Sequence, residues 1–237
     1  MYSFSSRVRY SEVDRNKKLD LSSIINYFQD CSTFQSEDQH VGISYLTEHS
    51  LAWMLSSWQI HVNRFPELGE HITASTWAYH FDSMYGYRNF TLTDSHNEVC
   101  AFANSIWILV DLNTGHPCRL SEDLVSVYPL EEQYPMEYAP RKIPLPKEYD
   151  EGQPIIVTSS NLDTNNHVNN GQYIKMAEDF LPDDFVIQQM RAEYRISARI
   201  GDVIIPRYTL SNTECTVALC HTNNKPYAVV QFTAAQE

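Results

Sequence analysis

Several features that would assign a protein to a membrane, a secretory route or a metal site are missing. No apolar run approaches the ~18 residues of a membrane-spanning helix. The polar start M-Y-S-F-S-S-R-V-R-Y resembles neither a signal peptide nor a transit peptide. Five cysteines form no C-x-x-C pair, and nine histidines show no metal-ligand spacing. We therefore predict a cytosolic protein with reduced thiols, without a membrane span, a metal or an organic cofactor.

Positive charge is also scarce. The chain has 17 Lys and Arg against 30 Asp and Glu, which gives a net charge of −13. Proteins that bind duplex nucleic acid normally carry the opposite sign, so this class is excluded. The 237 residues are 43% hydrophobic and 20% charged, which is typical of a globular protein with one or two domains.

The most informative segment, residues 161–173, reads N-L-D-T-N-N-H-V-N-N-G-Q-Y. Asp163, Asn165 and His167 alternate, which predicts an extended segment with all three side chains on one side. A helix pattern follows directly, and a helix N-terminus presents unpaired N–H groups. Attack on a carbonyl needs a base, groups that orient it and a donor for the oxyanion, and this segment could supply them. The alternative is that Asn and Asp only cap the helix and shape a turn.

Internal repetition favours the functional interpretation. Three blocks recur, in the same order: 12–20 with 161–169, 59–72 with 191–204, and 92–104 with 219–231. Asp14 then matches Asp163, while Lys18 takes the place of His167. The pattern indicates two copies of one domain that arose by duplication. Because the motif is complete in the second copy alone, we predict one active site per pair.

Hydrophobic periodicity predicts one main helix and four strands in each copy. The helices are expected at 21–35 and 169–181, and the strands at 51–64, 70–82, 85–94 and 98–111, then 186–200, 203–211, 215–222 and 226–234. We predict an α+β fold of two tandem hotdog domains, each an antiparallel sheet wrapped around a central helix. Frequent proline marks a linker at 128–152, between a first domain at 1–127 and a second at 153–237.

Three separated blocks carry distinctive motifs. Block 51–77 contains an R-x-P-x-x-G-[DE] turn and a closing T-W, block 105–120 reads S-I-W-I-L-V-D-L-N-T-G-H-P-C-R-L, and residues 161–174 contain D-x-N-x-H-V-N-N. Together they resemble the acyl-acyl-carrier-protein thioesterases of the tandem hotdog family, in which the second block is similar to the last strand of the first domain and the third corresponds to the signature. The resemblance implies hydrolysis of fatty acyl thioesters carried on the phosphopantetheine arm of acyl carrier protein. It implies His167 as general base, oriented by Asp163 or Asn165, with the first copy holding the acyl chain.

Two positions depart from that family's pattern. Its members often carry Glu-Cys or Glu-Ala after an E-Y-R-type strand start, where this chain has Ser197 and Ala198. A cysteine nucleophile at this position is therefore excluded. Ser197 can hold a water molecule by hydrogen bonding but cannot act as a base near neutral pH. The alternative is an ordinary strand serine.

Two sets of residues are candidates for substrate binding. Arg191, Arg195 and Arg199 have even spacing, which predicts one strand face that could bind the acidic carrier protein; the alternative is a solvated sheet face. Trp53 and Met54 are candidates for the lining of an acyl tunnel, and the alternative is that they belong to the core.

Other functions remain open at this stage. An acyl-coenzyme A thioesterase would share the same chemistry, and a non-catalytic acyl-binding or scaffolding protein would fit the changes at Ser197 and Ala198. A hotdog dehydratase is less favoured, because neither copy shows an H-F-P-G pattern. The acyl chain length and the oligomeric state, a homodimer included, are left open by the sequence.

Overall fold

A main helix followed by a run of strands occurs twice along the chain, which the computed structural model describes for residues 1–163 and 165–235. The chain divides into two units. The first comprises Met1–Ser56 with Val62–Tyr138, and the second comprises Ser57–His61 with the chain from Ala139 onward. The boundary after Tyr138 falls inside the segment that its prolines mark as a linker.

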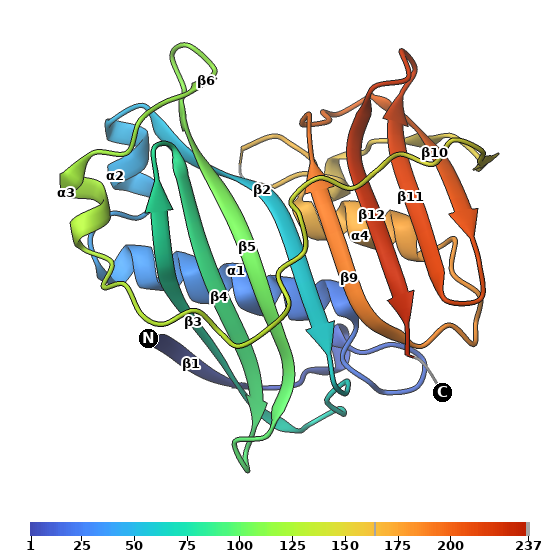
Figure 1. Ribbon diagram of the computed structural model, residues 1–237, viewed down its shortest axis with the longest axis horizontal. Coiled ribbons are helices and arrows are strands. Elements are labelled where there is room, and N and C mark those ends of the chain that lie inside the picture. Colours follow the sequence, from blue (N-terminus) through green and yellow to red (C-terminus); the bar gives the residue numbers. More distant parts are fainter. Residues whose placement is uncertain (164, 236–237) are drawn as a thin grey trace. The chain divides into compact units, whose positions relative to one another are not determined.

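The first unit is an antiparallel sheet with a long helix packed across it (Figure 1). Its helical elements are η1 (Tyr10–Glu12), α1 (Leu21–Asp38), α2 (Ile43–Glu48) and α3 (Glu122–Ser126). Its strands are β1 (Tyr2–Arg7), β2 (Leu51–Val62, shared with the second unit), β3 (His71–Asp82), β4 (Tyr85–Asp94), β5 (Val99–Asp111) and β6 (His116–Pro117). Pairing runs in the order β1-β3-β4-β5, with β6 on β5.

Helix α1 is held by its cap and by its apolar face. The Asp20 side chain accepts a hydrogen bond from the Ser23 N–H at 2.6 Å, which satisfies one donor of the first turn. Phe28 is fully buried, and its ring lies 5.2 Å from that of Phe90 on β4. Burial of such residues on one face stabilises the helix against the sheet.

The second unit repeats this arrangement (Figure 1). Its elements are β7 (Asp150–Glu151), β8 (Ile155–Ile156), η2 (Ser159–Asn161), α4 (Asn170–Glu178), β9 (Ile187–Tyr194), β10 (Val203–Leu210), β11 (Glu214–His221) and β12 (Pro226–Ala234). The strand order is β9-β12-β11-β10-β7, all antiparallel, and Ser57–His61 of β2 pairs with β9. The predicted α+β class, with one main helix packed on the antiparallel strands of each unit, is confirmed.

Equivalent turns of the two units share the same backbone conformation. Left-handed residues occur in three matched pairs: Lys17 with Asn166 (φ 62° and 58°), Gly69 with Gly201 (84° and 82°), and Asn97 with Asn224 (63° and 69°). A positive φ is uncommon outside glycine, and two of the three pairs contain no glycine, so these matches are unlike a chance similarity of sequence. They support an origin by duplication.

Most predicted strands agree with the structure to within one or two residues, but 186–200 was too long. Strand β9 ends at Tyr194, because the N–H groups of Arg195 and Ile196 both donate to the Tyr227 carbonyl, at 2.8 and 3.2 Å. Sharing one acceptor breaks the regular ladder. The predicted helix 169–181 is also shorter, and α4 ends at Glu178.

The first part of the proline-rich segment is hydrogen-bonded to the first unit. The buried Asn89 side chain of β4 accepts hydrogen bonds from the Tyr134 N–H and the Tyr138 hydroxyl, both at 3.0 Å. These bonds satisfy a polar group that would be costly to bury alone.

Through the described ranges of the chain, no helix combines the length and apolar composition that a bilayer crossing requires.

Candidate active site

The signature segment folds as a tight turn, so the prediction of an extended segment was wrong. The Asp163 N–H donates to the His167 carbonyl at 2.8 Å, and Asn166 is left-handed. The Asp163 Oδ1 accepts the Asn165 N–H at 2.8 Å and the His167 N–H at 3.3 Å. A side chain that binds two backbone N–H groups folds the chain back on itself. One carboxylate oxygen is therefore committed to shaping the turn.

The turn delivers His167 to the start of α4. His167 is half-buried and lies three residues before Asn170, the first helical residue. The Asn169 side chain caps the helix by accepting the Gly171 N–H at 2.8 Å, and its carbonyl accepts the Gln172 N–H at 2.9 Å. The positive end of the helix dipole thus lies close to the imidazole in sequence, while two of its N–H groups are already used.

The segment that follows β9 and contains Ser197 and Ala198, here called the Ser197 segment, is held against this turn. The Val168 N–H donates to the Ala198 carbonyl at 3.0 Å, and the Ala198 N–H donates to the Tyr173 hydroxyl at 2.9 Å. His167 and Ser197 each directly precede one partner of the Val168–Ala198 bond. Ser197 is half-buried and lies beyond the end of β9, so it is not the strand serine of the alternative interpretation.

Tyr173 was not recognised as a site residue from the sequence, where it only flanks the apolar face of a helix. Its side chain is buried, and desolvation raises the pKa of Tyr173 to about 12. The hydroxyl therefore stays protonated at neutral pH and can both accept and donate a hydrogen bond.

The three arginines do not share a strand face, because only Arg191 lies within β9. Its guanidinium donates to the Pro140 carbonyl at 2.5 Å and to the Lys142 carbonyl at 3.3 Å. Desolvation lowers the pKa of Arg191. This arginine therefore anchors the segment that follows Tyr138.

Arg195 and Arg199 differ in their surroundings. Arg195 donates to the Glu193 carboxylate at 2.8 Å and to the Ile143 carbonyl at 3.2 Å, so it also fixes that segment. Arg199 is exposed in a turn that is closed by its N–H bond to the Asp202 carboxylate, at 2.9 Å.

Trp53 and Met54 lie on the part of β2 that belongs to the first unit, and both are half-buried. Trp53 packs against a cluster of buried residues: Val41, Leu46, Ala78, Leu109, Leu124 and Tyr128. A contact of this kind is compatible with the core as well as with a tunnel wall, so their part in substrate binding stays a prediction.

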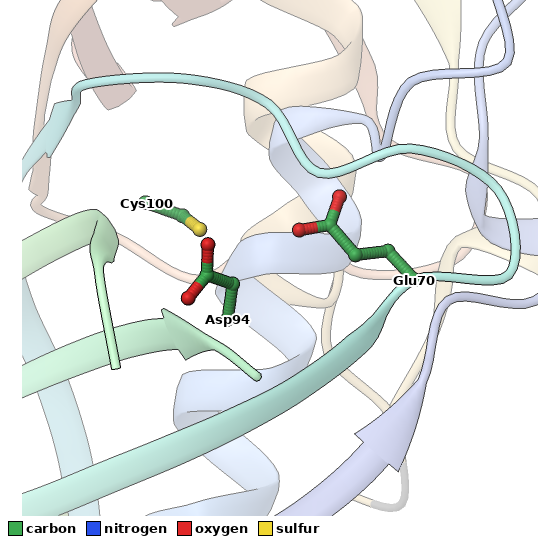
Figure 2. A group of neighbouring side chains, drawn as sticks. All are labelled: Glu70, Asp94 and Cys100. Atoms are coloured by element: carbon green, nitrogen blue, oxygen red, sulfur yellow. The ribbon is translucent and has the colours of Figure 1, made fainter. Parts of the chain in front are cut away.

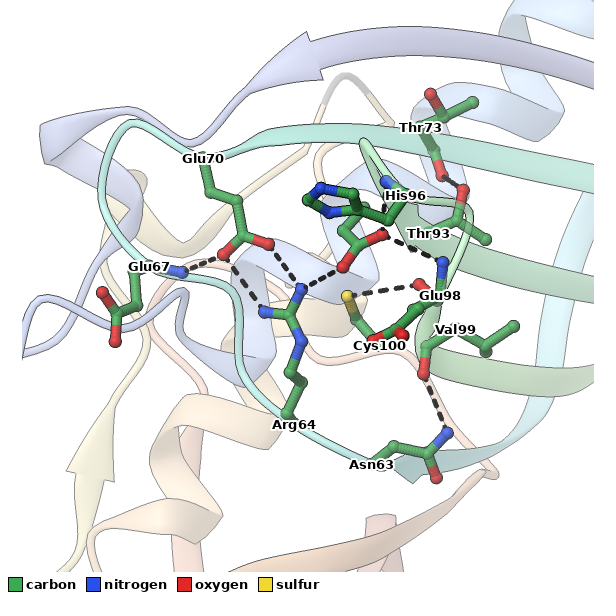
Figure 3. Close-up of polar contacts among 11 residues, drawn as sticks. Asn63, Arg64, Glu67, Glu70, Thr73, Thr93, His96, Glu98, Val99 and Cys100 are labelled. Carbon is green, nitrogen blue, oxygen red and sulfur yellow. Dashed lines mark hydrogen bonds and ion pairs between the residues drawn. The ribbon is translucent and has the colours of Figure 1, made fainter.

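A group of potential metal ligands occurs in the first unit. Ligand atoms of Glu70, Asp94 and Cys100 lie within 4.8 Å of one another (Figure 2). The Arg64 guanidinium already donates to both carboxylates, at 2.5 Å to Glu70 and 2.7 Å to Asp94 (Figure 3). Burial raises the pKa of Cys100 to about 11, so its thiol is protonated and a weak ligand. The group fits an ion-pair network better than a metal site.

The five thiols are poor nucleophiles. Burial raises the pKa of each one, to about 12 for Cys31 and to about 11 for Cys100 and Cys215. The thiolate is the reactive form, and these shifts disfavour it at neutral pH.

A variant with all five cysteines replaced by Ala or Ser is therefore expected to keep kcat within about tenfold of the wild-type value. This range allows for loss of packing at the buried thiols. The check is steady-state hydrolysis together with rapid-quench kinetics, which should show no acyl-enzyme burst. If a single substitution of Cys215 or of Cys220 abolished activity while the protein stayed folded, direct attack by water would be contradicted.

The sequence of this chain is similar to two family models and to known proteins. The family model described as the acyl-ACP thioesterase N-terminal domain matches residues 1–128, and the model of the C-terminal domain matches residues 146–232. The chloroplastic oleoyl-acyl carrier protein thioesterase 1 of Arabidopsis thaliana is 26% identical over 218 residues, which cover 83% of this chain and 60% of that protein. This chain thus spans less than two thirds of the length of that relative.

Two solved structures share the fold. An acyl-ACP thioesterase from Bacteroides thetaiotaomicron superposes with a TM-score of 0.89 at 23% identity, covering 98% of this chain and 97% of that one. The 12:0-ACP thioesterase from Umbellularia californica gives a TM-score of 0.84 at 16% identity, covering 100% and 97%. Since the two family models together match most of the chain, the protein belongs to the acyl-ACP thioesterase family.

Proposed function

We propose that the protein hydrolyses fatty acyl thioesters of acyl carrier protein, which releases the free fatty acid and the carrier. The observation that carries the proposal is the convergence of three elements in the second unit. The His167 turn, the start of α4 and the Ser197 segment are joined by two hydrogen bonds at Ala198. Family membership supplies the substrate class, and the five free thiols fit a reducing compartment such as the cytoplasm.

In the proposed reaction His167 acts as general base and takes a proton from the attacking water. The Asp163 carboxylate shapes the turn with one oxygen, which leaves its second oxygen, or the exposed Asn165 amide, to set the imidazole tautomer. Ser197 holds the water through its hydroxyl, in place of the Glu common in the family.

The start of α4 would stabilise the charge that develops on the thioester oxygen. Asn169 already uses the N–H groups of Gly171 and Gln172. The helix therefore acts on the oxyanion mainly through its dipole. The first unit, with Trp53 and Met54, is proposed to hold the acyl chain.

Arg199 is the arginine that we assign to docking of the acidic carrier, because Arg191 and Arg195 anchor the segment after Tyr138. The substitution Arg199→Glu is expected to raise KM about tenfold for acyl carrier protein substrates and to flatten its salt dependence. Turnover of a small soluble thioester should stay unchanged. Lys225→Glu, at another exposed turn of the same unit, is the control. An equal effect on both substrates would assign Arg199 to the fold.

The proposed function is tested by measuring release of free fatty acid from matched acyl carrier protein and acyl-coenzyme A substrates over a series of chain lengths. We expect a higher kcat/KM for the carrier-bound substrates. A preference for coenzyme A would identify the protein as an acyl-coenzyme A thioesterase. Binding of acyl chains without release would identify a non-catalytic protein, for which the changes at Ser197 and Ala198 are the supporting observation.

A further inference from the structure

One side-chain hydrogen bond links α4 to the segment that follows β9. The Tyr173 hydroxyl accepts the Ala198 N–H at 2.9 Å, and both residues are buried, with exposed fractions of 3% and 0%. That N–H belongs to the peptide group between Ser197 and Ala198. A peptide group is planar, so a bond at its nitrogen also fixes the orientation of the Ser197 carbonyl.

The first unit provides an internal comparison. Its equivalent of the Val168–Ala198 backbone bond is the bond from the Leu19 N–H to the Pro66 carbonyl, at 2.7 Å. The main-chain link is therefore present in both units, whether or not the unit contains the histidine.

The side-chain link differs between the units. Ile24 occupies the position of Tyr173, and Pro66 occupies the position of Ala198. Isoleucine has no hydroxyl and proline has no N–H, so both partners of the bond are missing together. The first unit thus shows that this backbone can be built without the bond. The bond is present in the unit that carries His167.

We propose that Tyr173 is a positioning residue that sets the orientation of Ser197 relative to the His167 turn; the proposal rests on the proposed function. The Ile196 bond to the Tyr227 carbonyl and the Val168–Ala198 bond hold the residues on either side of Ser197, but they leave the peptide group between Ser197 and Ala198 free to tilt. A second bond to the same residue, from the rigid helix that begins just after His167, removes that freedom. The group that holds the attacking water is then fixed before substrate binds.

The test replaces Tyr173 by Phe, which removes only the hydroxyl. We expect kcat to fall by ~10–10²-fold with KM unchanged within about twofold, because the loss is one of orientation and not of substrate binding. Exchange of the Ala198 amide hydrogen, measured by NMR, should become faster. The control is Tyr194→Phe, which removes a hydroxyl that donates to the Asn170 carbonyl of α4 at 3.2 Å. It should leave kcat within about twofold and the Ala198 amide protected.

A double-mutant test of Tyr173→Phe with Ser197→Ala distinguishes the positioning of Ser197 from a general loss of packing. In a Ser197→Ala background, Tyr173→Phe should cost little further activity, because the group that it positions is gone. Additive losses, or equal losses for Tyr173→Phe and Tyr194→Phe, would overturn the proposal. A wild-type protein without thioester hydrolysis would instead refute the proposed function, and the positioning role with it. Normal wild-type turnover with an unchanged kcat for Tyr173→Phe would refute the positioning role alone.

Discussion

Replacing His167 by Ala is expected to lower kcat by ~10²–10⁴-fold, the usual contribution of a positioned general base. The fold should survive, because the side chain is half-buried and its backbone bonds to Asp163 do not involve the imidazole. The measurement is steady-state hydrolysis of an acyl carrier protein substrate, with thermal unfolding as a check on structure.

The matched control for this variant is Lys18→Ala. Lys18 occupies the equivalent position of the first unit and is exposed. Its replacement should leave kcat within about twofold, the range expected for an exposed side chain that takes no part in the chemistry. Comparable losses at Lys18 and His167 would show that the functional difference between the two copies had been assigned wrongly.

Replacing Asp163 by Ala is expected to lower kcat by ~10–10²-fold, because the turn that presents His167 loses the acceptor of two backbone N–H groups. Loss of these bonds should also destabilise the protein by about 1 kcal/mol, which lowers Tm by ~2–4 °C. Both quantities can be followed on one preparation, by hydrolysis kinetics and calorimetry.

The first unit again offers a matched variant. The Asp14 Oδ1 accepts the N–H groups of Asn16 and Lys18, at 2.8 and 2.9 Å, in the same kind of turn. Asp14→Ala should therefore lower Tm by a similar amount and leave kcat nearly unchanged. A catalytic loss as large as that of Asp163→Ala would mean that the Asp163 effect reports stability, and the proposed role of its turn would be wrong.

The sheets could be predicted because their strands are long and end at residues with a preference for turns. The range 85–94 was predicted exactly as β4 is observed, between Ser83 and Asn97, two residues with a left-handed backbone. Helices α2 and α3 were missed, since six and five residues are too few to show a helical period. Strand β9 was overextended because the sharing of the Tyr227 carbonyl depends on a distant part of the chain.

The site could be predicted in composition but not in conformation. Alternation of Asp163, Asn165 and His167 suits a strand, yet an aspartate that binds the backbone two and four residues later makes a turn from the same spacing. Tyr173 could have been found by aligning the two copies of the domain. The second copy has Tyr173 where the first has Ile24, and Ala198 where the first has Pro66. The two positions differ together, and in the structure Tyr173 and Ala198 are in contact.

The Asp14 turn shows that this backbone can persist in a unit that lacks the histidine. After duplication, selection for stability alone can preserve it, while the residues around it are free to diverge. An aspartate-based signature would therefore report the ancestry of a copy and not its activity. In a relative of this protein, the pairing of histidine with a helix tyrosine would indicate which half had retained the reaction, and an exchange of roles between halves would need few substitutions.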